Sequence, residues 1–455
     1  MGSAVWASLL LLLIQCCAAA ARTVDRVAII GGGFAGLACA EIFSQTAKSV
    51  TVFDPRPPGC ALASSASAGI MHPMSPKGKV IWSGLEGMEA SLRLLNRAEA
   101  FAGGRRLVDR GLRLQRLLFS EKEVADWAKS ADKHPDLLQM LSPAEVAGGD
   151  RLPVGGALIK QAAVVHSAAY LQALWACTCE ETDARWEKRA VRATDLPLMT
   201  AEYDVVVVAG GAGSLGLWEG QRGTGSGRVA KLGLVRGQNL LYPMPEGGSL
   251  PTDTVLLSGE YVVPFRPITC GGSGDVVRGS GGSGGDISSI AGLTHTPHLI
   301  CGSTHEHISL AEYTAYESQQ TPQYNSAPDL PQGAQARAQL AAKIQRLSQL
   351  PLGGAVLGSA GVRVVAQRCS QGRLPLLGRA GAGVGAEETG VGAEAGIDAG
   401  AGVGTGAVIA EKLWLLTGLG SRGLIHHALL AESLHRAVTT EGDPLSHIPP
   451  GVDLE

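Results

Sequence analysis

The chain has 455 residues, which is enough to bury a large core and to form two connected domains. Charged residues make up 17% of it and the formal net charge is −3, so it lacks the basic surplus that nucleic-acid-binding proteins carry. The composition therefore argues against a nucleic acid as partner.

The first 21 residues have the pattern of a secretory signal peptide. Residues 5–14 form an apolar run too short to span a bilayer, and small residues before Arg22 offer A-x-A-like cleavage sites. No Lys or Arg precedes the run, which departs from that pattern, and an unprocessed extension is the alternative. We expect a secreted or secretory-pathway protein if the segment is cleaved, and an organellar or cytoplasmic protein otherwise. No membrane span is predicted.

Residues 27–54 predict a βαβ unit. An apolar strand, glycines at G-x-G-x-x-G spacing, a helix and a second apolar strand follow one another, and an acid comes directly after the second strand. The glycines allow a tight turn, a close approach to a pyrophosphate and close packing of helix on strand, while the acid can accept hydrogen bonds from a ribose. The start of the helix can bind the anion. This pattern predicts an ADP-containing cofactor but leaves FAD and NAD open; the predicted contacts are Gly31, Gly33, Phe34, Ala35, Gly36 and Asp54.

A segment of small residues, SSASAGIMHP at 64–73, follows a Pro-rich loop. Small side chains and hydroxyls let the backbone pass close to a flat ligand, so Ser64 and Ser65 are candidate cofactor contacts. An ordinary Ser-rich loop is the alternative. An amphipathic helix is predicted over 84–103.

These segments, together with later ones in the same order, resemble the D-amino-acid-oxidase-type family of FAD-dependent oxidoreductases. The family includes glycine oxidase, sarcosine oxidase and the oxidoreductase half of the bacterial tRNA-modification enzyme MnmC. The similarity extends over residues 27–438 and implies FAD as the cofactor. It also implies an α/β fold, with a Rossmann-like FAD-binding domain and a second, mainly antiparallel substrate-domain sheet.

The resemblance gives an expected division of the chain. The FAD-binding domain is expected to be discontinuous, and the substrate domain to fill the intervals between its pieces. The FAD-binding pieces are residues 22–75, 155–220 and 360–445, and the substrate pieces are residues 76–154 and 221–359. Low-complexity stretches at 271–286 and 380–406 are expected to be surface inserts.

Three later segments are similar to cofactor-contacting parts of the family. Residues 163–165 would hold the adenine side through backbone contacts at Val165, although core packing explains their side chains. The apolar strand at 205–208 ends in a Gly turn, which permits close approach and favours FAD over a simple NAD enzyme. Residues 413–437 resemble a last strand, a G-x-G-S-R-G turn and a final helix whose start can stabilise a reduced flavin. The implied contacts are Gly210, Gly211, Gly418, Gly420, Ser421, Arg422, Gly423 and Leu424.

The substrate side is expected around residues 361–378. A G-V-R match to the family implies that Arg363 pairs with a substrate carboxylate, and Arg368 is the alternative because the following linker is long. A solvated or ion-paired arginine is the structural alternative, and Gln371 stands where the family usually has an acid. His72 is a candidate near the flavin, and a satisfied structural histidine is the alternative.

Two further residues are candidates either for the substrate site or for a structural role in a turn. Arg236 and His305 lie in strand-like segments similar to those of the family's substrate-side sheet, where they are candidates for facing the ligand. Strand-end turns account for both residues equally well.

The expected activity is FAD-dependent oxidation of the C–N bond of an amino acid or N-substituted glycine by hydride transfer to the flavin. The substrate would be a small amine, and oxygen or another acceptor would reoxidise the flavin. The alternatives are a tRNA wobble-uridine carboxymethylaminomethyl oxidoreductase and a flavin-binding protein without turnover. No metal is predicted, because the seven cysteines outside the first 21 residues match no zinc-site spacing.

Overall fold

In the computed structural model, the strands form two large sheets and one small sheet. The predicted signal segment and both low-complexity stretches lie outside the described residues. The structure describes residues 23–60, 62–102, 105–146, 152–219, 232–244, 253–265, 298–318, 333–348, 356–366, 368, 373–379 and 411–440.

The first large sheet is the predicted Rossmann-like one. Five of its six strands are parallel, and only the edge strand β17 runs antiparallel. The strands, in spatial order, are β17 (Leu376–Arg379), β18 (Leu413–Thr417), β10 (Val205–Val208), β1 (Arg26–Ile30), β2 (Ser49–Phe53) and β9 (Asp183–Glu187). Parallel strands buried on both faces read as continuous apolar runs, which is why β1, β2, β10 and β18 are visible in the sequence.

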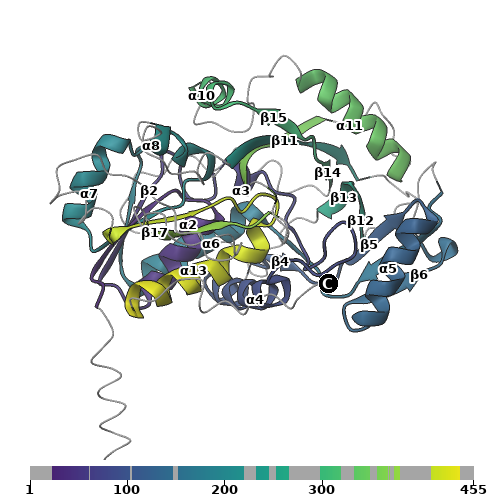
Figure 1. Ribbon diagram of the computed structural model, residues 1–455, viewed down its shortest axis with the longest axis horizontal. Helices are drawn as coiled ribbons and strands as arrows, with labels where there is room; N and C mark the ends of the chain where they lie inside the picture. Colours follow the sequence, from purple (N-terminus) through teal and green to yellow (C-terminus); the bar gives the residue numbers. More distant parts are fainter. Residues whose placement is uncertain are drawn as a thin grey trace, which may run out of the picture.

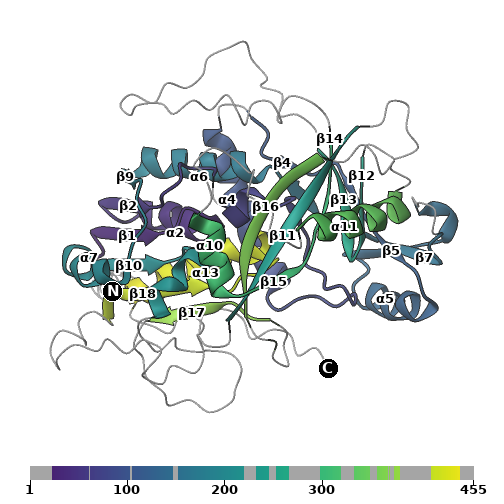
Figure 2. The same ribbon diagram turned by 90° about the horizontal axis from the view of Figure 1, so that it is seen from above.

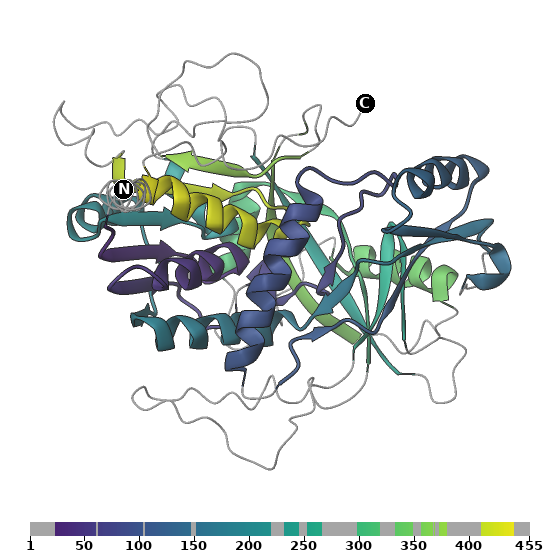
Figure 3. The same cartoon turned by 90° about the horizontal axis from the view of Figure 1, so that it is seen from below.

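Helices cover one face of this sheet, and the other face packs against a different core. Val205 and Val207 of β10 point into the helix side, whereas Val206 and Val208 point to the opposite side. Figure 3 shows α13 (yellow) lying beside α4 (blue) on the helix side, in agreement with their contacts. The helices on this face are α2 (Phe34–Ser44), α4 (Gly84–Phe101), α6 (Ser167–Glu181) and α13 (Gly423–Thr440).

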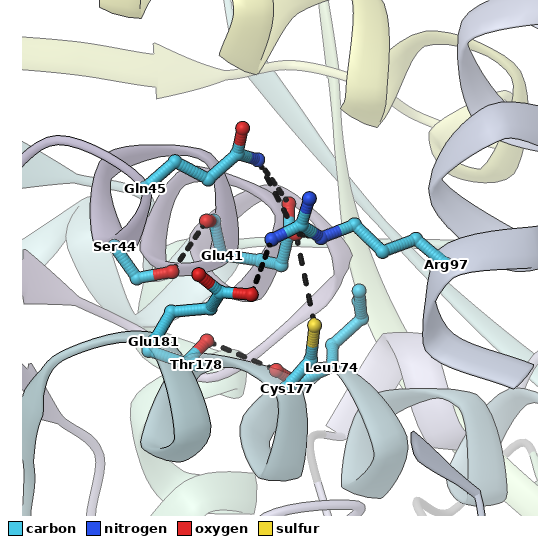
Figure 4. A network of polar contacts seen from close by, with 8 residues as sticks. All are labelled: Glu41, Ser44, Gln45, Arg97, Leu174, Cys177, Thr178 and Glu181. Atoms are coloured by element: carbon cyan, nitrogen blue, oxygen red, sulfur yellow. Dashed lines mark hydrogen bonds and ion pairs between the residues drawn. The ribbon is translucent and has the colours of Figure 1, made fainter. Parts of the chain in front are cut away.

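A buried polar network joins three of these helices (Figure 4). The Glu41 side chain in α2 is fully buried and forms an ion pair with Arg97 of α4. Arg97 also binds Glu181 of α6 at 2.9 Å, and the Cys177 thiol of α6 donates to Glu41 at 3.7 Å. Because its members come from three helices, with Cys177 and Glu181 both in α6, the network helps to fix how α2, α4 and α6 lie together.

The second large sheet has nine strands and is antiparallel except where β12 runs parallel to β5. Figure 2 shows its long strands β11 and β16 running between the two halves of the molecule. The strands, in order, are β15 (Glu306–Ile308), β11 (Leu232–Pro243), β14 (His298–Gly302), β13 (Glu260–Phe265), β12 (Thr254–Ser258), β5 (Arg113–Leu118), β7 (Gly155–Ile159) and β6 (Leu138–Leu141), with β16 (Val356–Ala366) paired to β11.

The remaining elements complete the two halves (Figure 1). Helix α11 (Gly333–Ser348) buries Leu340, Ile344 and Leu347 at helical spacing. The third sheet contains β3 (Ile70–Met71), β8 (Ala163–Val165) and β4 (Val108–Asp109). The other helices are α3 (Leu62–Ser65), α5 (Glu121–Lys133), α7 (Leu196–Glu202), α8 (Gly216–Glu219) and α10 (Leu310–Ser318).

The observed fold is the predicted α/β fold with a second, mainly antiparallel sheet, but some segments lie in other places than expected. β7 pairs with β5 and β6, and β16 pairs with β11, so both belong to the second sheet and not to the FAD-binding pieces. Helix α4, in a piece predicted for the substrate domain, packs on α6 and α13 of the first sheet. Strand pairing and helix packing depend on contacts between residues far apart in the sequence, which a local apolar pattern does not specify.

Candidate functional site

A cavity of about 1580 Å³ extends from the carboxyl ends of the parallel strands to a face of the second sheet. Ile30, Asp54, Ala209 and Thr417 line it at the ends of β1, β2, β10 and β18. Open parallel sheets bind ligands at this edge. Typical pockets for small ligands measure about 300–1,000 Å³, so this cavity has room for a larger occupant.

The glycine turn after β1 leaves no space for side chains. Gly31 has φ +108°, and a Cβ there would lie 2.5 Å from Gly210 Cα. A Cβ at Gly36 would overlap the carbonyl oxygen of Gly31. Gly31 therefore makes the tight turn, and Gly36 allows helix α2 to pack directly on it. Gly36 does not itself line the cavity.

The start of α2 faces the cavity and meets a serine from another segment. The Phe34 N–H donates to Ser64 Oγ at 3.1 Å, and a Cβ at Gly33 would lie 3.0 Å from the same oxygen. Gly33, Phe34, Ala35 and Ser64 all line the cavity, whereas Ser65 does not. The first N–H groups of a helix have no partner within the helix, so this end suits a phosphate.

Asp54 lies beside this turn and lines the cavity. Its carboxylate accepts the N–H of Gly32 and the N–H of Arg56, both at 2.8 Å. Burial raises the pKa of Asp54, while these two hydrogen bonds oppose that rise. Each carboxylate oxygen keeps a further lone pair, so Asp54 retains the capacity to accept ribose hydroxyls.

The segment expected on the adenine side lies away from the cavity. The Val165 N–H donates to the Gly69 carbonyl at 2.8 Å within the small sheet, and Val165 does not line the cavity. Instead Arg189, Ala190 and Val191, which follow β9, line it next to Asp54. The Asp54 N–H donates to Glu187 of β9 at 3.1 Å.

This segment was missed because β9 does not read as a buried strand. Its sequence is Asp-Ala-Arg-Trp-Glu, and its residues alternate between exposed and half-buried. The period-2 alternation after helix α6 is the signal that indicates an edge strand, and residues 189–191 then fall at its carboxyl end.

On the other side of β1 from β2 and β9, the two predicted glycine turns follow β10 and β18 and line the cavity. Gly211, with φ +56°, has no atom within 4 Å of where a Cβ would be, and Gly418 and Gly420 also have positive φ. Nearby, Ser214 Oγ and Thr417 Oγ1 are buried without a hydrogen-bond partner in the described part of the chain, and both residues line the cavity. Open backbone and unsatisfied hydroxyls suit a large polar cofactor. The cavity lining also includes Gly210, Gly211, Gly418, Gly420, Ser421, Arg422, Gly423 and Leu424.

Arg363 and Tyr261 line the part of the cavity that is formed by the second sheet. Arg363 of β16 is half-buried; burial and Arg373 lower the pKa of its guanidinium, whereas Tyr261 opposes this. Burial raises the pKa of Tyr261 to about 12, and its hydroxyl donates to Asn239 Oδ1 at 2.7 Å. Arg368 also lines the cavity but is exposed. Arg363 is therefore the better-enclosed cation of the two predicted ones.

His72 lines the cavity as a neutral donor. Burial, together with Arg116 and Arg422, lowers its pKa to about 4. Its Nδ1 accepts the Met74 N–H at 3.2 Å, so the neutral ring carries its proton on Nε2. His72 is therefore suited to hydrogen-bonding a ligand and is a poor base at neutral pH.

Arg236 does not face the ligand. Its side chain has 0% exposure and forms an ion pair with Glu306 at 2.8 Å, and it does not line the cavity. Glu306 also accepts hydrogen bonds from Gln238 and Thr304, both at 2.6 Å. This is a structural network, whereas His305 lines the cavity from the adjacent loop.

Fold and site together define a class: an α/β protein that holds an extended nucleotide cofactor against one sheet and a substrate against another. The family model described as DAO, FAD dependent oxidoreductase, matches residues 26–436. The chain belongs to this family, so it is an FAD-dependent oxidoreductase and its cofactor is FAD. The resemblance in the sequence is confirmed.

Solved structures share this fold at low sequence identity. Glycine oxidase from Geobacillus kaustophilus is 17% identical, with a TM-score of 0.58 over 91% of this chain and 95% of that chain. Iminodiacetate oxidase from Chelativorans sp. BNC1 is 15% identical, with a TM-score of 0.56 over 94% and 98%. L-alpha-glycerophosphate oxidase from Mycoplasma pneumoniae, with FAD bound, is 13% identical, with a TM-score of 0.54 over 92% and 95%. No curated protein matches the sequence.

In the described residues, no helix has the length and apolarity needed to cross a membrane. The same residues contain no group of three His, Cys, Asp or Glu side chains that could hold a metal ion.

Proposed function

We propose that this enzyme oxidises the C–N bond of an amino acid or an N-substituted glycine. The observation that carries the proposal is Arg363, a half-buried cation that lines the same cavity as the FAD-binding glycine turns. A guanidinium holds a carboxylate through two parallel hydrogen bonds, which fixes the direction of the substrate as well as its position.

The side chains around Arg363 suit that role. Tyr261 comes from β13, and its hydroxyl is held by Asn239, which in turn donates to the Ala66 carbonyl at 2.7 Å. Because its high pKa keeps Tyr261 protonated, the residue is a neutral hydrogen-bonding group beside the arginine. Arg363 would bind the carboxylate and orient the carbon next to nitrogen, while the Tyr261 hydroxyl, which donates its one proton to Asn239, lines the site beside it.

FAD would supply the acceptor for a hydride from that carbon, and water would hydrolyse the resulting imine. The residues Gly31, Gly33, Phe34, Ser64 and Asp54 would hold its ADP part. The turn from Gly418 to Leu424 would lie at the flavin. The protein's contribution is to bind, orient and exclude water, which needs no protein nucleophile. Oxygen or another acceptor would then reoxidise the flavin.

Two structural neighbours support the substrate class without deciding it. Glycine oxidase and iminodiacetate oxidase have this fold, but L-alpha-glycerophosphate oxidase has it too. The fold alone is therefore compatible with more than one kind of substrate, and the charge at Arg363 favours a carboxylated one.

The test is anaerobic reduction of the bound flavin, which is measured as the loss of its visible absorbance. Glycine, sarcosine, D-alanine and D-aspartate are the probes, with glycerol 3-phosphate as a substrate of another class. Bleaching by a carboxylated amine is the expected result. Bleaching by glycerol 3-phosphate alone, or only by tRNA carrying a carboxymethylaminomethyl wobble uridine, would overturn the proposal. Bleaching by none would favour flavin binding without turnover.

A further inference from the structure

A second arginine reaches the cavity from the far part of the second sheet. Arg116 of β5 pairs with Leu257 of β12, and Leu257 pairs with Tyr261 of β13. Tyr261 is opposite Gly302 of β14, and Gly302 is opposite Asn239 of β11. Directly paired residues project their side chains from the same face of a sheet, and Figure 2 shows these strands together.

This strand pairing separates Arg116 from Arg363, the residue proposed to bind the substrate carboxylate. Neighbouring strands lie about 4.8 Å apart, so the backbones of Arg116 and Tyr261 are separated by roughly 10 Å. Both side chains line the cavity. Arg363, on β16, lies on the other side of Tyr261, because β16 pairs with β11 at the far end of this row.

The guanidinium of Arg116 has uncommitted donors. Its Nε is buried without a hydrogen-bond partner, and no residue in the described ranges forms an ion pair with it. Two acids attract it, but Glu123 accepts from the Phe119 N–H at 2.8 Å and Glu260 pairs with Lys343 at 2.6 Å. Burial lowers the pKa of Arg116, whereas the charges of Glu123 and Glu260 oppose this change. Arg116 is half-buried, and a partly desolvated cation with free donors is stabilised when an anion binds it.

The neighbours of Arg116 in the cavity are also donors. His72 lies close enough for Arg116 to lower its pKa, and its neutral ring carries the proton on Nε2. Arg422, from the turn before α13, acts on His72 in the same way. Arg116, Arg422 and His72 all line the cavity, so they supply cationic and neutral donors to it, while Glu123 and Glu260 already have other partners. This set of donors suits a carboxylate.

We propose that Arg116 and His72 form a second anionic subsite, which binds a distal carboxylate of the substrate. The preferred substrate is then a dicarboxylic amine, such as an N-carboxyalkyl glycine or an acidic amino acid. Arg363 binds the carboxylate next to the reacting carbon, and Arg116 binds the other. This inference rests on the proposed function and narrows it.

The first test compares two probes that share the reacting N–CH₂–COO⁻ group. Iminodiacetate has a second carboxylate and sarcosine has a methyl group in its place. We expect wild-type flavin to be reduced faster by iminodiacetate at equal low concentration. Arg116→Met should lower the second-order rate constant for iminodiacetate about 10- to 100-fold more than that for sarcosine, the range for losing a hydrogen bond to a charged group.

Matched variants separate charge recognition from damage to the fold. Arg113→Met changes an exposed arginine on the same strand and should leave the ratio of the two rate constants unchanged. Arg116→Lys keeps the charge and should restore part of the ratio. Equal losses on both probes in Arg116→Met, or no wild-type preference for iminodiacetate, would overturn the proposal. Weaker FAD retention in Arg116→Met, with the ratio unchanged, would assign Arg116 to the cofactor instead.

A second measurement remains informative if no amine reduces the flavin. Thiodiacetate and (methylthio)acetate replace the amine by sulfur and differ only in the second carboxylate. Their dissociation constants follow from changes in the flavin absorbance spectrum. Tighter binding of thiodiacetate to wild type, lost in Arg116→Met, would support the subsite even though the proposed oxidation had failed. Equal affinities of wild type for both ligands would reject the subsite.

Discussion

Arg236 and Arg363 show how differently the fold uses two arginines on paired strands. Arg236 precedes a glycine and Arg363 comes two residues after one, both in strand-like sequence. The local sequence pattern alone therefore does not show which of the two faces a ligand. Arg236 is fully buried against Glu306, whereas Arg363 is half-buried at the cavity. The presence or absence of a protein carboxylate partner separates a structural arginine from one free to bind a substrate, and that partner is 70 residues away in the chain.

Arg363 carries the first prediction at this scale. Arg363→Leu should lower the second-order rate constant for flavin reduction by a carboxylated amine about 100-fold or more, because the carboxylate would lose its buried partner. Stopped-flow reduction under anaerobic conditions measures it. Arg368→Leu is the matched control, since this arginine is exposed, and we expect a change of less than about threefold. If Arg368→Leu lowered the rate constant more than Arg363→Leu, Arg368 would be the residue that binds the carboxylate.

Gly36 carries the second prediction. In Gly36→Ala, the new methyl group would overlap the Gly31 carbonyl, so α2 must move away from the turn. We expect the purified variant to retain little FAD and to lose about 1–3 kcal/mol of stability from overpacking. The ratio of flavin to protein absorbance and the melting temperature measure these effects.

Gly216→Ala provides the comparison for this substitution. A Cβ at Gly216 meets no atom within 4 Å, so this variant should keep its FAD and its stability. Full FAD content in Gly36→Ala would show that the close contact of helix and turn is not needed for cofactor binding.

Among the elements, the buried strands of the first sheet were the most predictable, whereas its edge strand β9 and the strand β5 of the second sheet were not predicted. β1, β2, β10 and β18 are continuous apolar runs because both faces are buried. β5 contains two arginines and faces a polar cavity on one side, so its pattern is mixed. The Gly turns could be read from local conformation, but the cavity position of residues 189–191 depends on β9 pairing with β2.

Helix α13 contains two adjacent buried histidines whose pKa values are lowered. It buries His426 and His427, and burial lowers the pKa of each to about 4. His426 Nε2 lies 2.9 Å from the Trp82 carbonyl oxygen, and His427 Nε2 lies 2.8 Å from the Tyr170 hydroxyl. Both rings are therefore neutral in the folded protein at pH 7, and protonation would place a charge between α13 and its neighbours.

The third prediction follows from the sign of these shifts. A folded-state pKa near 4, below the unfolded value of 6.5, means that the unfolded chain binds more protons between these pH values. Stability is then complete above about pH 6.5 and falls as the pH is lowered toward 4, by about 3 kcal/mol for each such histidine. In His427→Gln, the fall in melting temperature between pH 7.5 and pH 5 should be smaller than in wild type.

Ser433→Ala is the control for this measurement, because it removes a buried hydroxyl from the same helix without removing a titrating group. It should lower the melting temperature about equally at both pH values. If His427→Gln kept the full wild-type dependence, His427 would not be one of the groups that destabilise the protein in acid.

At the scale of the whole molecule, the cavity belongs to neither sheet alone. Its lining comes from the parallel strand ends, from β11, β13 and β16 of the second sheet, and from the turn that precedes α13. The sequence could indicate FAD because three separate glycine turns recur in the family's order. It could not indicate Arg116, because the row from Arg116 to Asn239 exists only after five strands have paired.

This arrangement leads to the last prediction, that FAD stabilises the molecule as a whole. A cofactor that binds only the folded state adds RT ln(1 + [FAD]/Kd), which is about 2.7 kcal/mol at 100 times Kd. For a chain of this size, we expect FAD at 100 times Kd to raise the melting temperature of the apoprotein by about 3 °C, and the rise to grow with the logarithm of its concentration.

Scanning fluorimetry of deflavinated protein at several FAD concentrations measures this rise, with NAD as the control ligand. NAD supplies the ADP part but no flavin for the turn at Gly418 to Leu424, so it should stabilise less. Gly36→Ala should lose most of the response to FAD, because the phosphate end of the site is displaced. A rise with NAD that equals the rise with FAD would mean that the ADP turn alone accounts for binding, and that the second and third glycine turns contribute little. A larger rise with FAD would instead show that the separate segments act as one extended site.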